Sequence, residues 1–388
     1  MGIATLSLKN HLKLNKKPRI CIVTYPRSMA SVTPLLNLAK ILSELSNCLF
    51  LITGNEGEKV LKAQPHIHGC SINYQKKAFI PLRLLDHVIL QIKIAIKIIQ
   101  FNKNVDFYIF YMGEGLVLPM LICKITRKNV SVALAGSLSQ ITKNDKESLS
   151  NIFVFMEHIN YFLADKLIIY SKRLINEWGL QRYSRKTCVA HEQFIDIEDF
   201  KIDTSGQPKA MIGFIGRLSE EKGILNFIKA IPIILQARND VRFFIGGDGH
   251  LKSEVEEYLN TNNLKDKVAF CGWIKHDELP EYFSRIRLLV LPSYTEGLPN
   301  IMLEAMACRT PVLATAIGAI PDVIINNQTG LLMESNSPEC ISTSVLHALN
   351  YSDLEQISQN AFSLVLKEFT FHQAVETYGN ALKTKRHS

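Results

Sequence analysis

The chain has 388 residues, of which 47% are hydrophobic and 21% are charged, and its formal net charge is +8. This length favours two domains over one, and this composition excludes a disordered or low-complexity protein. The charge is uneven: residues 1–205 hold 27 basic and 16 acidic side chains, whereas residues 206–388 hold 17 and 20. The basic first half indicates an anionic partner, such as a membrane surface or a phosphorylated acceptor. A solvated basic face is the alternative.

Targeting and cysteine signals are sparse. Residues 1–19 are polar and basic and contain no apolar core of a secretory leader,. No stretch of about 20 residues is free of charge, so we expect no membrane-spanning helix. The eight cysteines form no CxxC pair, which fits free thiols in a reducing compartment better than a disulfide framework or a zinc site. We therefore expect a cytoplasmic protein, at most peripheral on the inner face of a membrane.

In the first half, near-continuous apolar runs alternate with helical stretches. The predicted strands are residues 19–25, 48–53, 106–112, 130–136 and 166–171. A helix is predicted from about residue 31 to 45. Strands that are apolar along their whole length imply a parallel sheet covered by helices on both faces.

Residues 84–101 come nearest to a membrane-spanning segment, but they carry Asp86, Lys93 and Lys97. One interpretation is an ordinary helix packed on the sheet. The other is an amphipathic helix that lies flat on an anionic bilayer.

A polar stretch with Gly206 and Pro208 is the best candidate for a linker,. After it the alternation of strands and helices begins again. The predicted strands are residues 210–216, 241–247, 268–274, 288–293, 311–315 and 330–334. A terminal helix is predicted at residues 368–384. The pattern predicts an α/β protein of two doubly wound parallel-sheet domains facing across a cleft.

Two glutamates lie eight positions apart in the segment PSYTEGLPNIMLEAMACRTPVLAT. Glu296 follows a buried apolar run, and Glu304 lies on a helix predicted from about residue 300 to 308. Ligands of parallel sheets bind where loops leave the carboxyl ends of the strands. Two carboxylates that only accept hydrogen bonds suit a ligand rich in hydroxyls, such as a sugar and a ribose.

The segment GFIGRLSEEKG places Gly216, Arg217 and Lys222 after another predicted strand. A strand-end loop with helix amides and two cations suits a phosphate group. Surface charges on an α/β turn are the alternative. A glycine turn, GGDGH, contains Gly247. The chain lacks a GxGxxG fingerprint after its first strand and lacks a Walker motif, which argues against a hydride-transfer or P-loop enzyme.

Together these segments resemble the donor domain of glycosyltransferase family 4. The resemblance rests on GRLSEEKG, GGDG, VAFCGWI, EGLPNIMLEAMACRTPVLAT, GAIPDVI and GLL, in this order over residues 213–332. The first half resembles the family through LADKLIIYSKRLINEWGL and FIDIEDF. The resemblance implies the GT-B fold, with an acceptor-binding Rossmann-like domain at 1–205 and a donor-binding one at 206–388. The terminal helix is expected to end the second domain or to cross back to the first.

The resemblance also implies roles for individual residues. Arg217 and Lys222 would bind the donor diphosphate and steady the leaving group, and Glu296 would contact the sugar hydroxyls. These three form the expected catalytic set. The expected donor-binding residues are Gly216, Gly247, Trp273, Ile274, Gly297, Leu298 and Glu304. Within that set, Glu304 would bind the ribose and the segment at Trp273 would hold the base.

One departure from the family concerns a histidine that many members carry after the strand equivalent to 130–136. Here Gly136 and Ser137 occupy that region, so the backbone or Ser137 would take over the contact. Arg27, after the first strand, is a candidate for binding an acceptor phosphate, with a surface arginine as the alternative. Arg27 and Ser137 are the two candidate acceptor-side residues.

The resemblance implies a retaining hexosyltransferase that uses a nucleotide diphosphate sugar and needs no cofactor. No DxD-like motif is evident, so we expect no metal. The expected acceptor is lipid-linked or a cell-surface glycan precursor, peripheral contact with an anionic membrane is expected, and nucleic acid is not an expected partner. A sugar-nucleotide epimerase, a phosphorylase or an inactive sugar-nucleotide-binding protein on the same fold are the alternatives.

Overall fold

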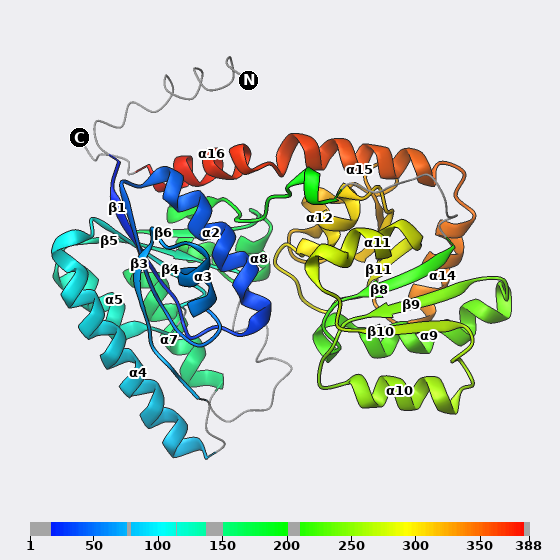
Figure 1. Ribbon diagram of the computed structural model, residues 1–388, viewed down its shortest axis with the longest axis horizontal. Helices are drawn as coiled ribbons and strands as arrows, with labels where there is room; N and C mark the ends of the chain where they lie inside the picture. Colours follow the sequence, from blue (N-terminus) through cyan, green and yellow to red (C-terminus); the bar gives the residue numbers. More distant parts are fainter. Residues whose placement is uncertain (1–16, 76–78, 114, 137–149, 201–209, 384–388) are drawn as a thin grey trace. The chain divides into compact units, whose positions relative to one another are not determined.

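A computed structural model describes residues 17–75, 79–113, 115–136, 150–200 and 210–383 (Figure 1). The predicted linker at Gly206 and Pro208 lies outside these residues. The chain divides into two compact units. The first unit holds the described residues up to Ile169, then Arg182–Glu192 and the chain from Val375 onward. The second holds Tyr170–Gln181 and Gln193–Ala374. Each unit is therefore built from more than one chain segment, whereas the sequence predicted a single boundary between residues 205 and 206.

The first unit contains a seven-stranded parallel sheet. Its strands are β1 (Arg19–Val23), β2 (Cys48–Thr53), β3 (His68–Ser71), β4 (Phe107–Tyr111), β5 (Asn129–Ala133), β6 (Lys166–Ile169) and β7 (Thr187–Val189). Their order is β3-β2-β1-β4-β5-β6-β7. The order reverses between β1 and β4, which makes this pair the switch point of a doubly wound sheet.

Helices cover both faces of the first sheet. The helices α2 (Val32–Leu45) and α3 (Glu58–Ala63) connect the strands on one side of the switch point. The helices α4 (Ile80–Phe101), α5 (Val117–Ile125) and α7 (Ser150–Leu163) connect those on the other side. Because parallel crossovers are right-handed, the two groups lie on opposite faces. Figure 1 shows α4, α5 and α7 gathered together, and α5 contacts both of the others.

The second unit contains a six-stranded parallel sheet with the order β10-β9-β8-β11-β12-β13. Its strands are β8 (Met211–Ile215), β9 (Arg242–Gly246), β10 (Val268–Gly272), β11 (Ile286–Leu291), β12 (Val312–Thr315) and β13 (Leu331–Met333). Its helices are α8 (Leu174–Glu177), α9 (Ile224–Ala237), α10 (Lys252–Thr261), α11 (Leu279–Arg285), α12 (Asn300–Ala307), α13 (Ile320–Val323), α14 (Pro338–Leu349) and α15 (Leu354–Glu368). The switch point lies between β8 and β11.

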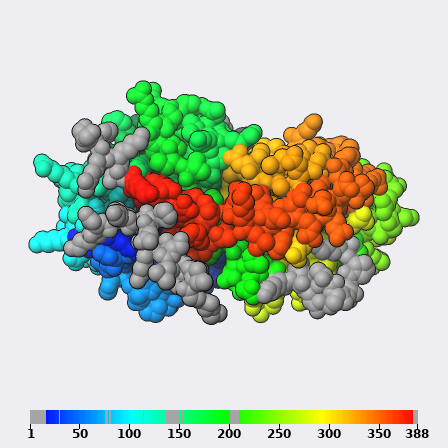
Figure 2. All heavy atoms as spheres, turned by 90° about the horizontal axis from the view of Figure 1, so that it is seen from above, coloured from blue at the N-terminus to red at the C-terminus, as the bar shows by residue number. Residues whose placement is uncertain are grey.

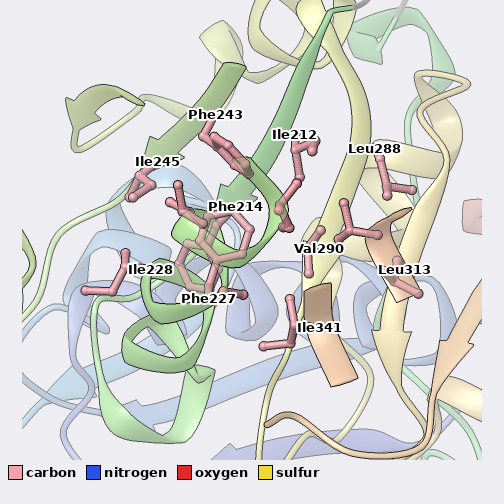
Figure 3. Close-up of a cluster of buried hydrophobic side chains, with 14 of the residues drawn as sticks. Ile212, Phe214, Phe227, Ile228, Phe243, Ile245, Leu288, Val290, Leu313 and Ile341 are labelled. Atoms are coloured by element: carbon pink, nitrogen blue, oxygen red, sulfur yellow. The ribbon is translucent and has the colours of Figure 1, made fainter. Parts of the chain in front are cut away.

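Apolar side chains from the strands and from α9 form the core of the second unit (Figure 3). Phe214 and Phe243 project from β8 and β9 toward Phe227 and Ile228 of α9, and all four are buried. The buried residues of α9 recur at intervals of three and four, which is the spacing of one helix face,. The packing of α9 against α14 closes this side of the sheet.

The last helix, α16 (Phe371–Leu382), begins in the second unit and ends in the first. The end of the described chain, with the orange-to-red α15 and the red α16, is seen on the face drawn in Figure 2. In the part of the chain that the structure describes, no helix is long and apolar enough to cross a membrane.

All eleven predicted strands are present, so the predicted doubly wound α/β fold of two units is confirmed. Two strands were not predicted, β3 and β7. Both lie at an edge of the first sheet, and both are short and partly exposed. The apolar pattern of a buried strand is therefore weak in both of them.

Candidate active site

The central feature of the second unit is an ion pair at its switch point. Lys222 follows β8 and Glu296 follows β11, and these two strands are neighbours where the sheet order reverses. The Nζ atom of Lys222 lies 2.7 Å from Oε1 of Glu296. The carboxyl ends of strands at such a point form the usual ligand crevice of an open α/β sheet.

A glycine turn brings the lysine to the glutamate. The one-turn helix η5 (Glu220–Lys222) ends at Gly223, whose φ is 70°. A Cβ atom on Gly223 would overlap the carbonyl oxygen of Pro292. The backbone N–H of Tyr294 donates to the carbonyl of Glu221 over 2.8 Å. The turn after β8 therefore packs directly on the loop after β11, and only glycine allows this approach.

The Glu296 carboxylate is held by two donors on one of its oxygens. Besides Lys222, the hydroxyl of Ser293 donates to Oε1 over 2.8 Å. The side chain of Glu296 is 9% exposed and that of Lys222 is 24% exposed. Within the described residues, the second oxygen, Oε2, receives no hydrogen bond. A fixed carboxylate with one oxygen available can accept a hydrogen bond from a ligand hydroxyl.

The loop after β12 supports the backbone of this glutamate. Gly318 has a φ of 57°, and a Cβ there would overlap the carbonyl oxygen of Glu296. The N–H of Ala319 donates to the carbonyl of Gly297 over 2.9 Å. The N–H of Gly318 donates to Oε2 of Glu177 over 3.1 Å, and burial raises the pKa of this carboxyl. The turn after β8, the loop after β11 and the loop after β12 thus fix the position of Glu296.

A second acidic side chain, Glu304, lies on α12 and is buried. Its Oε1 lies 2.9 Å from Nε2 of His276, which is half-exposed. The hydrogen bond to Glu304 raises the pKa of His276, so the charged imidazolium is favoured,. The ring of Phe200 packs against His276 in an edge-on contact, with the centroids 5.5 Å apart.

Two of the predicted donor-site glycines contact each other. The N–H of Gly216 donates to the carbonyl of Gly246 over 3.0 Å. A Cβ on Gly247, whose φ is 137°, would overlap the carbonyl oxygen of Gly216. Close approach of the loops after β8 and β9 accounts for glycine at residue 247, whether or not a ligand contacts it.

The other predicted donor-site residues differ in exposure. Arg217 pairs with Glu221 on its own turn, with Nη1 and Oε1 2.6 Å apart, and half of its side chain is exposed. Trp273 is 65% exposed, whereas Ile274 is buried next to Gly246. Leu298 is also buried. The side chains of Ile274 and Leu298 therefore belong to the core, and only their backbone groups are candidates for ligand contact.

The structure brings together Lys222 and Glu296, as expected for members of one site, and leaves Arg217 on the exposed rim. Sequence reasoning missed His276, Gly318 and Glu177. Gly318 lies in the motif GAIPDVI, so its signal was present in the sequence. His276 and Glu177 are single polar residues whose partners lie 28 and 141 positions away. No local pattern marks such contacts.

In the first unit, Arg27 follows β1 at the switch point of its own sheet. Its backbone N–H donates to the carbonyl of Gly54 over 3.0 Å. Its Nη1 donates to the hydroxyl of Thr24 over 3.3 Å. This position agrees with a ligand-facing loop, and the acceptor role of Arg27 stays a prediction. Ser137 lies outside the described residues.

Lys222, Glu296 and Glu304 all fall in a segment with known relatives. Residues 196–363 match the model of the family "Glycosyl transferases group 1". This segment is therefore similar to the glycosyl transferases of group 1. The narrower assignment to family 4 stays a prediction.

Proteins similar to the chain include an uncharacterised glycosyltransferase of Methanocaldococcus jannaschii. It is 27% identical over 246 residues, which are 63% of this chain and 58% of that protein. The alpha-D-kanosaminyltransferase of Streptomyces kanamyceticus is 25% identical over 201 residues, 50% of this chain and 52% of that protein. The chain thus spans about half the length of the curated relatives that it matches.

Among solved structures, Anabaena HepE in complex with UDP matches with a TM-score of 0.74 at 18% identity. The match covers 94% of this chain and 99% of that one. At this identity the likeness shows the fold, and it confirms the predicted GT-B type of architecture with two Rossmann-like units.

Proposed function

We propose that the chain is a retaining glycosyltransferase that moves a hexose from a nucleotide diphosphate sugar to an acceptor. The observation that carries the proposal is the Lys222–Glu296 pair at the switch point of the second unit, in the segment that matches the group 1 family. A cation and a carboxylate with one oxygen available stand side by side there. The cation suits the diphosphate, and the carboxylate suits the sugar hydroxyls.

The cations have a specific task in this proposal. When the bond between sugar and diphosphate breaks, negative charge grows on the leaving diphosphate. Lys222 retains two further N–H donors beyond its bond to Glu296,. Lys222 and Arg217 would stabilise the transition state more than the ground state, which is the condition for catalysis. Because these two side chains supply the positive charge, we propose a reaction that needs no metal ion.

The names of the relatives support the substrate class. They include 2-deoxystreptamine glucosyltransferase and a capsular polysaccharide biosynthesis glycosyltransferase of Staphylococcus aureus. HepE was crystallised with UDP-glucose. For this chain we propose a hexosyl donor and an acceptor that is lipid-linked or a cell-surface glycan precursor. The basic first half supports an acceptor that carries phosphate,.

A thermal-shift panel of UDP-, GDP- and ADP-sugars tests the donor site directly. A ligand that binds only the folded chain adds about 2.7 kcal/mol of stability at 100 times its Kd. We expect one nucleotide class to raise the melting temperature of the wild type. Lys222→Ala should reduce that shift, and Lys229→Ala, which removes an exposed lysine of α9, should not. A panel in which no nucleotide sugar raises the melting temperature would contradict the proposal.

Incubation of the bound donor separates the proposal from its alternatives. A transferase releases nucleoside diphosphate only as sugar reaches an acceptor or water. An epimerase converts the nucleotide sugar into its epimer with no acceptor present. An inactive binding protein gives the thermal shift but no product with any acceptor. Formation of an epimer, or binding without turnover on lipid-linked and glycan acceptors, would overturn the proposed reaction.

A further inference from the structure

Helix α4 of the first unit is apolar on two opposite faces. The face that packs on the unit is buried and includes Leu90, Ile94 and Ile98. The opposite face is exposed, each side chain by 40–56%. Its members, here called the outward stripe, are Leu82, Leu85, Val88, Ile89, Ile92, Ile96 and Ile99.

The outward stripe is continuous along the helix. Its members recur at intervals of three and four residues, so they lie on one side of an α-helix. From Leu82 to Ile99 the stripe is about 26 Å long at 1.5 Å per residue. A helix on the surface of a globular protein normally presents polar side chains there, and one that is apolar all round is normally buried. A continuous exposed apolar surface of this kind marks an interaction site.

Positive charge borders the outward stripe. The basic residues of α4 are Arg83, Lys93 and Lys97, against one acidic residue, Asp86, and the stripe itself carries no charge. Lys93 and Asn73 line two adjoining pockets of about 290 and 350 Å³ on the flank of the helix. Apolar side chains bordered by lysines and polar pockets match the interface of an anionic bilayer, where acyl chains adjoin phosphate headgroups.

The neighbouring helices extend the apolar surface. On α5, which contacts α4, the exposed apolar side chains are Leu118, Leu121 and Ile125. On α7, which contacts α5, they are Ile152, Phe155 and Phe162. The three helices lie together in Figure 1. In the described part of the second unit, large exposed apolar side chains are scattered among different elements, so the concentration on α4, α5 and α7 is a local feature.

We propose that the outward stripe of α4 docks on an anionic lipid bilayer. The stripe would enter the boundary between headgroups and acyl chains, and Lys93 and Lys97 would meet lipid phosphates. A second copy of the chain is a poorer occupant, because both surfaces would carry the same positive charge, whereas anionic lipid complements it. The docking rests on the proposed function in one respect, the lipid-linked acceptor. Docking would hold the enzyme at the membrane surface where such an acceptor is presented.

Vesicle flotation of the full chain tests the docking. We expect binding to phosphatidylcholine vesicles with about 30 mol% phosphatidylglycerol, and weaker binding to phosphatidylcholine alone. Raising the salt to about 0.5 M should weaken the binding, because the charge contribution is screened. Some vesicle binding should remain measurable at this salt concentration, because salt does not screen the apolar contribution.

Two pairs of variants assign the binding to α4. Ile92→Gln with Ile96→Gln should lower vesicle binding about 10-fold or more, since each substitution removes apolar area that docking on the bilayer would bury. The matched control, Ile325→Gln with Leu366→Gln, changes two exposed apolar residues of the second unit and should bind as the wild type. Lys93→Glu with Lys97→Glu should abolish the preference for anionic vesicles, whereas Lys229→Glu with Lys265→Glu should keep it.

The outcomes are decisive in either direction. No binding of the wild type to anionic vesicles at low salt, or wild-type binding by the Ile92/Ile96 variant, overturns the docking. A wild-type dimer that dissociates in this variant, without vesicle binding, assigns the stripe to a protein contact instead. The thermal shift with nucleotide sugars reports on the second unit and should be unchanged in the α4 variants. Vesicle binding without any such shift would remove the proposed function and leave the docking intact.

Discussion

Lys222 and Glu296 are 74 positions apart in the sequence, yet Nζ of one lies 2.7 Å from Oε1 of the other. The contact exists because β8 and β11 are adjacent and each residue follows its strand by a short loop. Ser293 and Gly318 then hold the glutamate from two further directions. The ion pair is therefore held in place by the packing at the switch point, and we expect its two members to act together.

Glu296→Gln should lower transfer about 100-fold or more, because it removes the charge opposite Lys222 and replaces one of the two acceptor oxygens with an NH2 group that only donates. The substitution preserves the shape of the side chain, but it leaves a largely buried lysine without its ion pair. We expect a loss of about 1–3 kcal/mol in the free energy of unfolding. Initial rates with the donor identified by thermal shift, together with urea unfolding, separate the two effects. A variant with wild-type rates would remove Glu296 from the catalytic set.

Arg217→Ala should lower the rate of transfer with little change in stability. Its ion pair with Glu221 is half-exposed, and such pairs contribute about 0–1 kcal/mol,. The matched control is Arg238→Ala, whose ion pair with Asp240 is also at the surface but at the opposite end of α9. We expect the control to transfer at the wild-type rate. Equal rates in both variants would assign Arg217 to the surface, the alternative reading of its sequence motif.

Gly223→Ala should both destabilise the second unit and lower transfer. Alanine at a φ of 70° is strained, by about 1–2 kcal/mol, and its Cβ would also overlap the carbonyl of Pro292,. Gly272→Ala is a close control, because Gly272 has a φ of 74° but open space around its Cβ position. We expect the control to show only the loss from strain. If both variants lose equal stability and equal activity, the turn does not position Lys222.

The sequence reveals the strands of this arrangement better than the contacts between its loops. The central strands were predictable, because long apolar runs leave no alternative to burial on both faces. Lys222, Glu296 and Glu304 could be assigned to one unit, because the first two follow predicted strands and Glu304 lies on the helix after the second of these. The pairing of Lys222 with Glu296 could not, since it depends on the close packing at Gly223. For α4 the sequence allowed two interpretations, a helix packed on the sheet and a helix lying on a bilayer. Composition alone cannot distinguish an apolar helix that is buried on one face from one that is buried on both.

The contact between His276 and Glu304 predicts a pH dependence of stability. The hydrogen bond that His276 donates to Glu304 raises the pKa of His276 above its ordinary value of 6.5. A group whose pKa is raised by folding binds its proton more tightly in the folded state, so its contribution is complete below about pH 6.5 and is lost as the pH rises through the raised pKa. Because the imidazole is half-exposed, we expect this contribution to be below about 1 kcal/mol,.

The comparison of wild type with His276→Gln measures this contribution. Urea unfolding between about pH 5.5 and pH 9 should give a difference in the free energy of unfolding that is largest at the acid end and shrinks as the pH rises. His250→Gln is the matched control, because His250 lies 2.7 Å from Glu220 and the side chains of both residues are well exposed. Because water screens that pair more strongly, His250→Gln should change the free energy of unfolding less than His276→Gln does. A difference for His276→Gln that grows toward high pH would show that the neutral imidazole, not the imidazolium, is bound to Glu304.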